Sequence, residues 1–254
     1  MAWFRCSAPA QSGTLDQIAT IALGTEFDYF ELETETETIP QYLFHGSMIR
    51  DVESADVITV QDRVFEGCSN LRKINLPNCT SIGQYAFACN RTTYANSIQI
   101  NLPAVQNIGA SAFAGFYGVD SSAELSFPAC TYIGQYAFQG SQNNPFTCKS
   151  IEFPQVETMG GSSFTRLIAD TVDIGATCTS MGATPFGNAT INKLIVRATL
   201  PPTLATNNGL GSGANITQIY VPDSAVNTYK DSTNYPRWAA YGAIISPLSD
   251  LPTT

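Results

Sequence analysis

Apolar residues recur along this chain in one six-residue motif, whose clearest copies are Ile82-Gly-Gln-Tyr-Ala-Phe87 and Ile133-Gly-Gln-Tyr-Ala-Phe138. The motif opens on Ile, Val or Met and closes on Phe, with small or polar residues between them. The closing residues are Phe44, Phe65, Phe87, Phe113, Phe138, Phe164 and Phe186, at spacings of 21, 22, 26, 25, 26 and 22 residues. A period of this length predicts a stack of repeated units.

A second pattern, in which apolar and polar residues alternate, follows each motif. It covers residues 71–77, 98–103, 124–128, 151–154, 172–174, 194–196 and 219–222. Alternation with a period of two predicts a short strand with one buried face. Proline ends several of these segments, and it has no N–H to continue a ladder. The six-residue motif predicts a tight turn, supplied by Gly, into a short helical or 3-10 piece whose Ile and Phe face inward.

One such unit cannot bury its apolar face alone, so the units must stack strand on strand. The fold expected is a repeat solenoid, with a parallel sheet on one face and short helical or 3-10 turns on the other. Residues 27–222 would form the solenoid, with about seven repeats. Residues 1–26 would be an attachment or capping segment. Residues 223–254 would be a small α/β cap, with Val226 and Tyr229 on one helix face and Trp238 in a second apolar patch.

The order strand, Leu-Pro, spacer, Ile-Gly-x-x-Ala-Phe, then Cys or Gly resembles the BspA-type (Treponema-like) leucine-rich repeat over roughly residues 39–222. The resemblance implies a curved solenoid with its parallel sheet on the concave face. It also implies a surface-exposed protein that binds other proteins or cells.

The repeat register places three of the seven cysteines in one column. Cys79, Cys130 and Cys178 each precede a motif by three residues, and Val105 and Val156 take that place in other repeats. A column that accepts Cys or Val is a buried apolar ladder. We therefore expect most cysteines to be buried free thiols. Because the chain has no Cys-x-x-Cys pair, we expect no structural zinc.

Charge and chemistry exclude several function classes. With 12 basic and 21 acidic residues, net −9, the chain has no basic patch for nucleic acid. It has no apolar run that could insert into a membrane. The single histidine, His45, belongs to no catalytic motif. The acidic run at residues 26–38 fits a solvated strand edge better than a calcium loop. We expect a non-enzyme without cofactor or metal.

Three consecutive repeats carry four or five extra residues between the motif and the next strand. In a stack, equal insertions lie side by side as a ridge and often mark a binding face. The ligand-binding residues predicted for this ridge are Asn90, Arg91, Tyr94, Phe116, Tyr117, Asp120, Asn143, Asn144 and Phe146. In the alternative, these loops are longer turns with Phe116 or Phe146 in the core. A rival surface is the exposed column of the sheet, Asn75, Asn101, Ser126, Glu152, Asp173, Ile195 and Tyr220.

The first residues, Met1-Ala-Trp-Phe-Arg-Cys6, suggest where the protein acts. They resemble the start of phage tail-region structural proteins and lack the apolar stretch of a signal peptide. The function expected is a virion appendage or decoration protein that contacts the host surface. A bacterial cell-surface adhesin is the alternative, and a carbohydrate-active enzyme is a third, disfavoured reading. Partners would be a host-surface glycan or protein, other virion proteins, or a second copy of the chain in a homo-oligomer.

Overall fold

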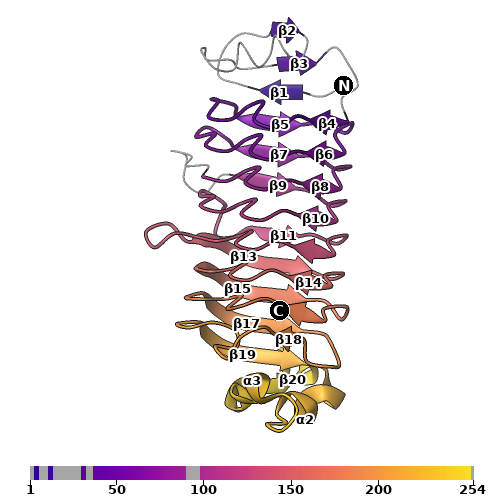
Figure 1. Ribbon diagram of the computed structural model, residues 1–254, viewed down its shortest axis with the longest axis vertical. Helices are drawn as coiled ribbons and strands as arrows, with labels where there is room; N and C mark the ends of the chain where they lie inside the picture. The colour runs from indigo at the N-terminus through magenta and orange to yellow at the C-terminus, as the bar shows by residue number, and fades with distance from the viewer. Residues whose placement is uncertain (1–2, 6–10, 14–29, 33–36, 90–97, 253–254) are drawn as a thin grey trace.

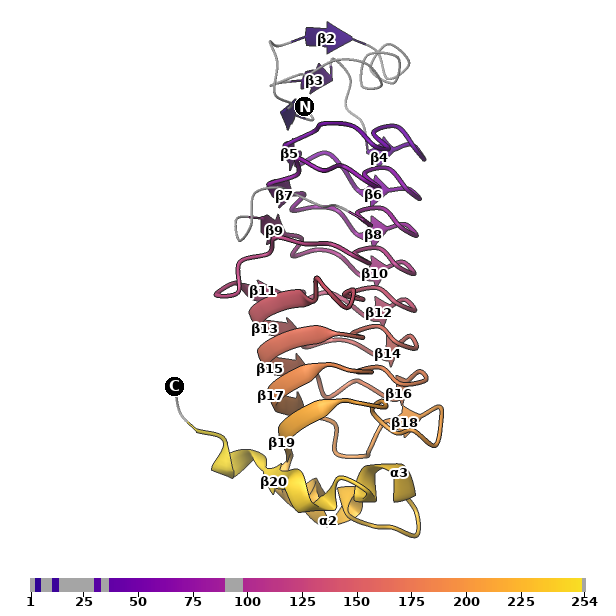
Figure 2. The same ribbon diagram turned by 90° about the vertical axis from the view of Figure 1, so that its left-hand side faces the viewer.

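The protein, described by a computed structural model over residues 3–5, 11–13, 30–32, 37–89 and 98–252, is a parallel β-solenoid of about nine turns with little helix (Figures 1 and 2). Each turn, or coil, contributes one strand to each of two sheets. The fold expected from the repeat is therefore confirmed.

The broader sheet, called the main sheet below, contains two parallel ladders. The first is β5 (Asp51–Glu53), β7 (Lys73–Asn75) and β9 (Gln99–Asn101). The second is β11 (Glu124–Ser126), β13 (Phe146–Phe153), β15 (Leu167–Ile174), β17 (Thr190–Val196) and β19 (Asn215–Val221). Between the two ladders, Ile98 forms a single bridge to Val119 in the loop that precedes β11. The main sheet is thus interrupted at one of the predicted insertions.

The narrow sheet runs along the other side of the solenoid and consists of eight two-residue strands. They are β4 (Thr38–Ile39), β6 (Thr59–Val60), β8 (Ser81–Ile82), β10 (Asn107–Ile108), β12 (Tyr132–Ile133), β14 (Thr158–Met159), β16 (Ser180–Met181) and β18 (Thr203–Leu204). The second residue of each strand is buried. The first residue is exposed or partly exposed, so period-two alternation persists even in strands this short.

The motif after each narrow-sheet strand forms a hydrogen-bonded turn, where we had expected a helical or 3-10 piece. At its fourth position lies a residue with positive φ, such as Tyr85 (56°) or Tyr136 (59°). The motif glycine has another role. A Cβ on Gly134 would lie 2.5 Å from the backbone nitrogen of Ala110 in the preceding coil. Glycine is needed there because the coils approach closely, and the sharp bend occurs two residues later.

Phenylalanine rings form the centre of the core. The seven motif rings stack coil on coil, with centroids 5.1–5.6 Å apart, from Phe44 to Phe186. All seven are at most 2% exposed. Nearly parallel rings at this separation are attractive when they are offset, and each ring also removes a large apolar area from water.

The predicted Cys/Val column is also buried, with Cys79, Val105, Cys130, Val156 and Cys178 all at most 2% exposed. Cys68 and Cys148 are buried free thiols as well, and Cys89 is an exposed one. Cys6 lies outside the described residues. Burial raises the pKa of Cys79 to about 11 and that of Cys130 and Cys178 to about 12. These thiols act as small apolar side chains.

Both ends of the stack are covered. At the N-terminal end, β1 (Trp3–Arg5) pairs antiparallel with β5 and with β3 (Phe30–Leu32), and β3 pairs with β2 (Gln11–Gly13). At the C-terminal end, β20 (Ile245–Pro247) extends the main sheet beyond β19. Four short helices precede β20 in the chain: η1 (Asp223–Ala225), α2 (Val226–Tyr229), α3 (Pro236–Ala239) and η2 (Gly242–Ile244). A fifth, η3 (Leu248–Asp250), follows it.

Candidate binding surfaces

The outward column of the main sheet is in the register that the sequence indicates. Asn75 pairs with Asn101, and Glu152 pairs with Ser126 on one side and with Asp173 on the other. Asn101, Ser126 and Glu152 are exposed, whereas Asn75 and Asp173 are partly exposed. The strands therefore present a continuous row of polar side chains within each ladder.

The last two members of this column are not available to a partner. Ile195 is 4% exposed and Tyr220 is 8% exposed. Tyr220 pairs with Ser246 of β20, and η3 contacts β19. Figure 2 shows the C-terminal segment on the main-sheet side of the last coils. The expected exposure of these two residues is wrong. At Tyr220 the cause is the chain after β19, which packs beside this strand as β20 and η3.

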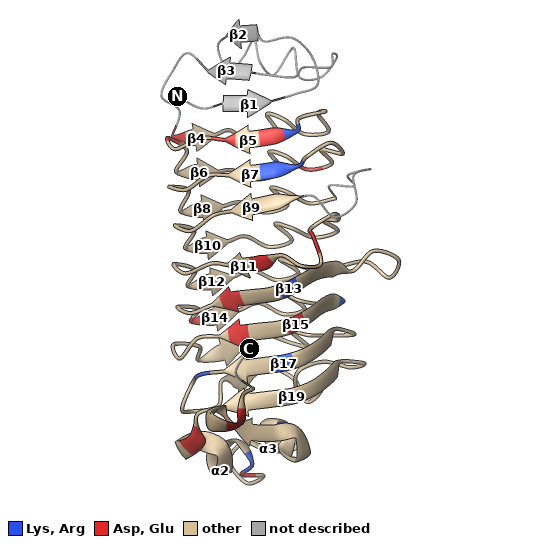
Figure 3. Cartoon of the chain, turned by 180° about the vertical axis from the view of Figure 1, so that it is seen from behind, with Lys and Arg blue, Asp and Glu red and all other residues tan. Residues whose placement is uncertain are grey.

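Charged residues on the main sheet are linked from coil to coil. Lys73 Nζ lies 2.8 Å from Glu53 Oε2, and Arg197 Nη2 lies 2.7 Å from Asp173 Oδ2. Lys149 donates a hydrogen bond to Glu124, which lowers the pKa of Glu124. Figure 3 shows acidic positions on β5, β11, β13 and β15 of this face. The exposed surface of the main sheet is therefore polar, with ion pairs that link neighbouring coils.

Two of the predicted ridge residues are core residues. Phe116 and Phe146 are each 1% exposed. They pack edge-on against Phe113 and Phe138, with centroid distances of 5.6 and 5.4 Å. Their assignment to a binding surface is therefore corrected, as in the alternative interpretation of the insertions: the second loop turns Phe116 into the core, and Phe146 is the buried first residue of β13.

The remaining ridge residues lie on loops that contact each other. Tyr117 donates a hydrogen bond of 3.3 Å to Ser141, which links the second loop to the third. Asn143 and Asn144 are exposed. Asp120 accepts hydrogen bonds from the backbone and side chain of Ser122, and these lower its pKa. Asn90, Arg91 and Tyr94 lie outside the described residues.

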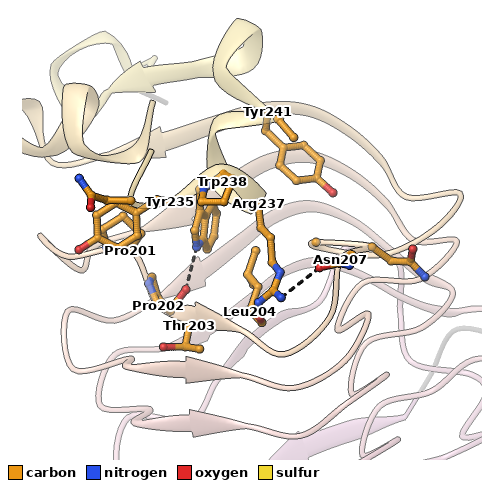
Figure 4. A pocket seen from close by; sticks show the side chains of 14 residues that line it. Pro201, Pro202, Thr203, Leu204, Asn207, Tyr235, Arg237, Trp238 and Tyr241 are labelled. Atoms are coloured by element: carbon orange, nitrogen blue, oxygen red, sulfur yellow. Dashed lines mark hydrogen bonds between the residues drawn. The ribbon is translucent and has the colours of Figure 1, made fainter. Parts of the chain in front are cut away.

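A third surface, which the sequence analysis missed, is a cleft of about 540 Å³ between α3 and the chain on either side of β18 (Figure 4). Four side chains of the cap span this junction. Trp238 Nε1 donates to Pro202 O at 2.7 Å, Tyr229 donates to Ala198 O at 2.9 Å, and Tyr241 accepts from Leu210 N at 3.1 Å. Arg237 donates to Leu204 O and to Asn207 Oδ1. The signal in the sequence was the aromatic cap, which we had interpreted only as a lid.

No catalytic constellation forms in the part of the chain that the structure describes. His45 is half-exposed, and its Nε2 lies 3.4 Å from Glu66 Oε2. Within the described residues there is no group of three His, Cys, Asp or Glu side chains that could hold a metal ion. A search of the same residues for a long apolar helix capable of crossing a membrane finds none.

Comparisons with known proteins find leucine-rich repeat proteins. A family model described as the BspA type leucine rich repeat region, in six copies, matches residues 23–144 and 115–233. Among solved structures, a leucine-rich repeat protein from Bacteroides ovatus aligns with 14% identity and a TM-score of 0.39. The alignment covers 77% of this chain and 60% of that protein. No curated protein matches the chain.

Proposed function

The chain belongs to the BspA-type leucine-rich repeat family, and on that premise we propose that it is a cell-surface adhesin of a bacterium that binds another protein through its main sheet. Leucine-rich repeat domains mediate protein binding, and proteins of this family are typically non-catalytic. The proposal rests on one observation, the outward polar residues that lie in register within each ladder of the main sheet: Asn75 and Asn101 in the first, and Ser126, Glu152 and Asp173 in the second.

The size of this surface allows a small protein interface. The six strands from β5 to β15, at about 4.8 Å each, cover a length of roughly 29 Å. The sheet is roughly 10 Å wide at the three-residue strands β5 to β11 and roughly 26 Å wide at the eight-residue strands β13 and β15. The resulting area of roughly 440 Å² is about half of the roughly 800 Å² that each partner contributes to a standard protein interface, so a weak protein contact is expected.

Binding is tested with the recombinant protein arrayed on fluorescent beads, so that weak contacts act together. The beads are offered to a panel of bacteria, to epithelial cells and to purified cell-wall glycans, each with and without protease treatment. We expect binding that protease abolishes. Binding to purified glycans alone, or no binding by the multivalent beads, would overturn the proposal.

The surface is tested with two main-sheet substitutions and one narrow-sheet control, of which Ser126→Lys and Asn107→Lys each add a single positive charge. Ser126→Lys and Glu152→Lys alter the centre of the main sheet, and Asn107→Lys places the same side chain on the narrow sheet. All three positions are exposed, so each variant is expected to keep the wild-type unfolding midpoint. The main-sheet variants should lose binding and Asn107→Lys should retain it. Loss of binding with Tyr117→Ala instead would assign the contact to the ridge.

Cell fractionation tests the location. An adhesin should fractionate with the envelope of the producing bacterium and be accessible to antibody on intact cells. A virion appendage, the other placement that the sequence suggests, should instead be present in purified particles at a defined copy number.

A further inference from the structure

We propose that the cleft between the last coil and the C-terminal cap is a separate binding site for an acidic saccharide of one or two sugar rings. Nothing in the protein-binding role of the main sheet requires this site, since it is formed by different residues. Its volume, about 540 Å³, lies within the range of roughly 300–1,000 Å³ that small-molecule sites occupy.

The walls of the cleft are held in place before any ligand arrives. Trp238 and Arg237 extend from α3 to carbonyl groups of Pro202 and Leu204 on the opposite wall (Figure 4). Tyr241 accepts the backbone N–H of Leu210, on the same stretch of chain. These contacts join residues 31 to 36 positions apart. A site whose walls are fixed in this way loses little conformational freedom on binding, which favours affinity.

Sugar recognition requires flat apolar surfaces beside hydrogen-bonding groups. Pro201, Tyr235 and Tyr241 all line the cleft, and Figure 4 shows Tyr235 and Tyr241 toward opposite ends of it. Such rings pack against the C–H face of a pyranose. The side-chain amides of Asn207, Asn208 and Asn234 also line the cleft. Asn207 Oδ1 already accepts from Arg237 and Asn234 Nδ2 already donates to Asp231, which leaves Asn207 Nδ2, Asn234 Oδ1 and the amide of Asn208 for ligand hydroxyl groups.

The charge of the cleft favours an acidic ligand. Of the described residues that line it, Arg237 is the single charged one, and none carries a carboxylate. Arg197 and Arg63 each pair with a carboxylate, but no carboxylate of the described residues forms an ion pair with Arg237. Its hydrogen bonds to Leu204 and Asn207 use two of the five guanidinium donors. A ligand carboxylate would supply the missing negative charge and accept the remaining donors.

Binding is measured by NMR through the indole N–H of Trp238, whose side chain lines the cleft. The chain has two tryptophans, so a Trp3→Phe variant assigns the signal. The probes are a uronic-acid disaccharide, its carboxyl-reduced neutral form, and acetate. We expect the acidic disaccharide to shift the Trp238 signal and to bind about tenfold more tightly than either other probe, a difference of about 1.4 kcal/mol.

Two substitutions separate a ligand effect from a folding effect. Asn208→Asp adds a carboxylate at an exposed position of the cleft, and Asn143→Asp adds one at an exposed position of the distant ridge. Asn208→Asp should weaken binding of the acidic disaccharide about tenfold, because like charges repel, and should leave the neutral form unaffected. Asn143→Asp should change neither.

Three results would overturn the assignment. The first is the absence of any Trp238 shift with either disaccharide. The second is equal affinity for the acidic and neutral forms or for acetate, which would remove the charge or the sugar from the argument. The third is an equal effect of Asn143→Asp and Asn208→Asp. None of these results bears on protein binding by the main sheet, so the two proposals fail separately.

Discussion

Replacing Gly134 with alanine should strongly destabilise the solenoid, although it adds a single methyl group. The new Cβ would lie 2.5 Å from Ala110 N, and ordinary contact begins at 3.4 Å, so the two coils must separate locally by 3.4 − 2.5 = 0.9 Å. The hydrogen bond from Gly134 N to Ile108 O would lengthen from 2.8 to 3.7 Å, beyond the range of a hydrogen bond.

The cost follows from those two effects. A broken buried hydrogen bond costs about 1–3 kcal/mol, and overpacking of a closely packed interior costs about 1–3 kcal/mol. Because separating the coils relieves part of the overpacking, we expect the free energy of unfolding to fall by about 2–4 kcal/mol.

Gly242→Ala is the matched control, because a Cβ there meets only the side chain of Lys230, at 3.7 Å. Neither glycine has a positive φ, so the same chemical change is compared with and without the close contact. Gly242→Ala should be neutral, or stabilising by up to about 1 kcal/mol.

The assay is urea unfolding followed by circular dichroism, with native-state hydrogen exchange to detect opening of single coils, since repeat proteins need not unfold in one step. If Gly134→Ala unfolds at the same urea concentration as Gly242→Ala, close approach of the coils does not explain the motif glycine.

Three further outcomes follow from the core and the cap. Phe138→Ala should cost about 4–5 kcal/mol in urea unfolding, because this ring contacts five other phenylalanine rings, whereas Phe186→Ala should cost about 3 kcal/mol, because among the described rings it stacks on Phe164 alone. Alkaline titration should destabilise the protein above pH 9, because burial raises the folded-state pKa of five thiols from 9.0 to about 11 or 12. The contribution of these thiols to the free energy of unfolding is fully present below pH 9 and falls as the pH rises towards 11. Tyr241→Phe should accelerate hydrogen exchange of the buried Leu210 amide and cost about 1–3 kcal/mol, because that amide loses its acceptor.

Each of these has a contrary result. Equal losses for Phe138→Ala and Phe186→Ala would mean that the number of ring contacts does not decide stability. Unfolding midpoints that stay constant from pH 8 to pH 11 would contradict the burial of the thiols, as would rapid native-state labelling of more than Cys89 in a Cys6→Ser variant. An unchanged exchange rate at Leu210 would mean that the Tyr241 hydroxyl does not hold the cap against the last coil.

Local pattern was sufficient for the solenoid itself. Three patterns predict which side chains point inward: the spacing of the motif phenylalanines, the alternation in the strands and the Cys/Val column. Phe87, Cys130 and Ile151, one from each pattern, are buried as predicted. Because each coil contacts mainly its neighbours, inward and outward positions in one coil determine those in the next. The register of Asn75, Asn101 and Glu152 could therefore be predicted from the chain alone.

Only the tertiary structure decided which outward residues remain exposed and where a cleft lies. Phe116 belongs to an irregular loop without a period, so no pattern indicates that it turns into the core, whereas Phe146 begins β13 and is buried because that strand extends further toward the N-terminus than the three-residue strands before it. Ile195 and Tyr220 face outward by alternation and are nevertheless buried, and at Tyr220 the chain beyond residue 221 pairs alongside as β20. The cleft requires α3 to meet a loop some 30 residues earlier, and its side chains converge through contacts that sequence spacing does not encode. Short-range periodicity determines whether a side chain points toward the core or away from it. Whether an outward side chain is exposed depends on which distant segment of the chain packs over it.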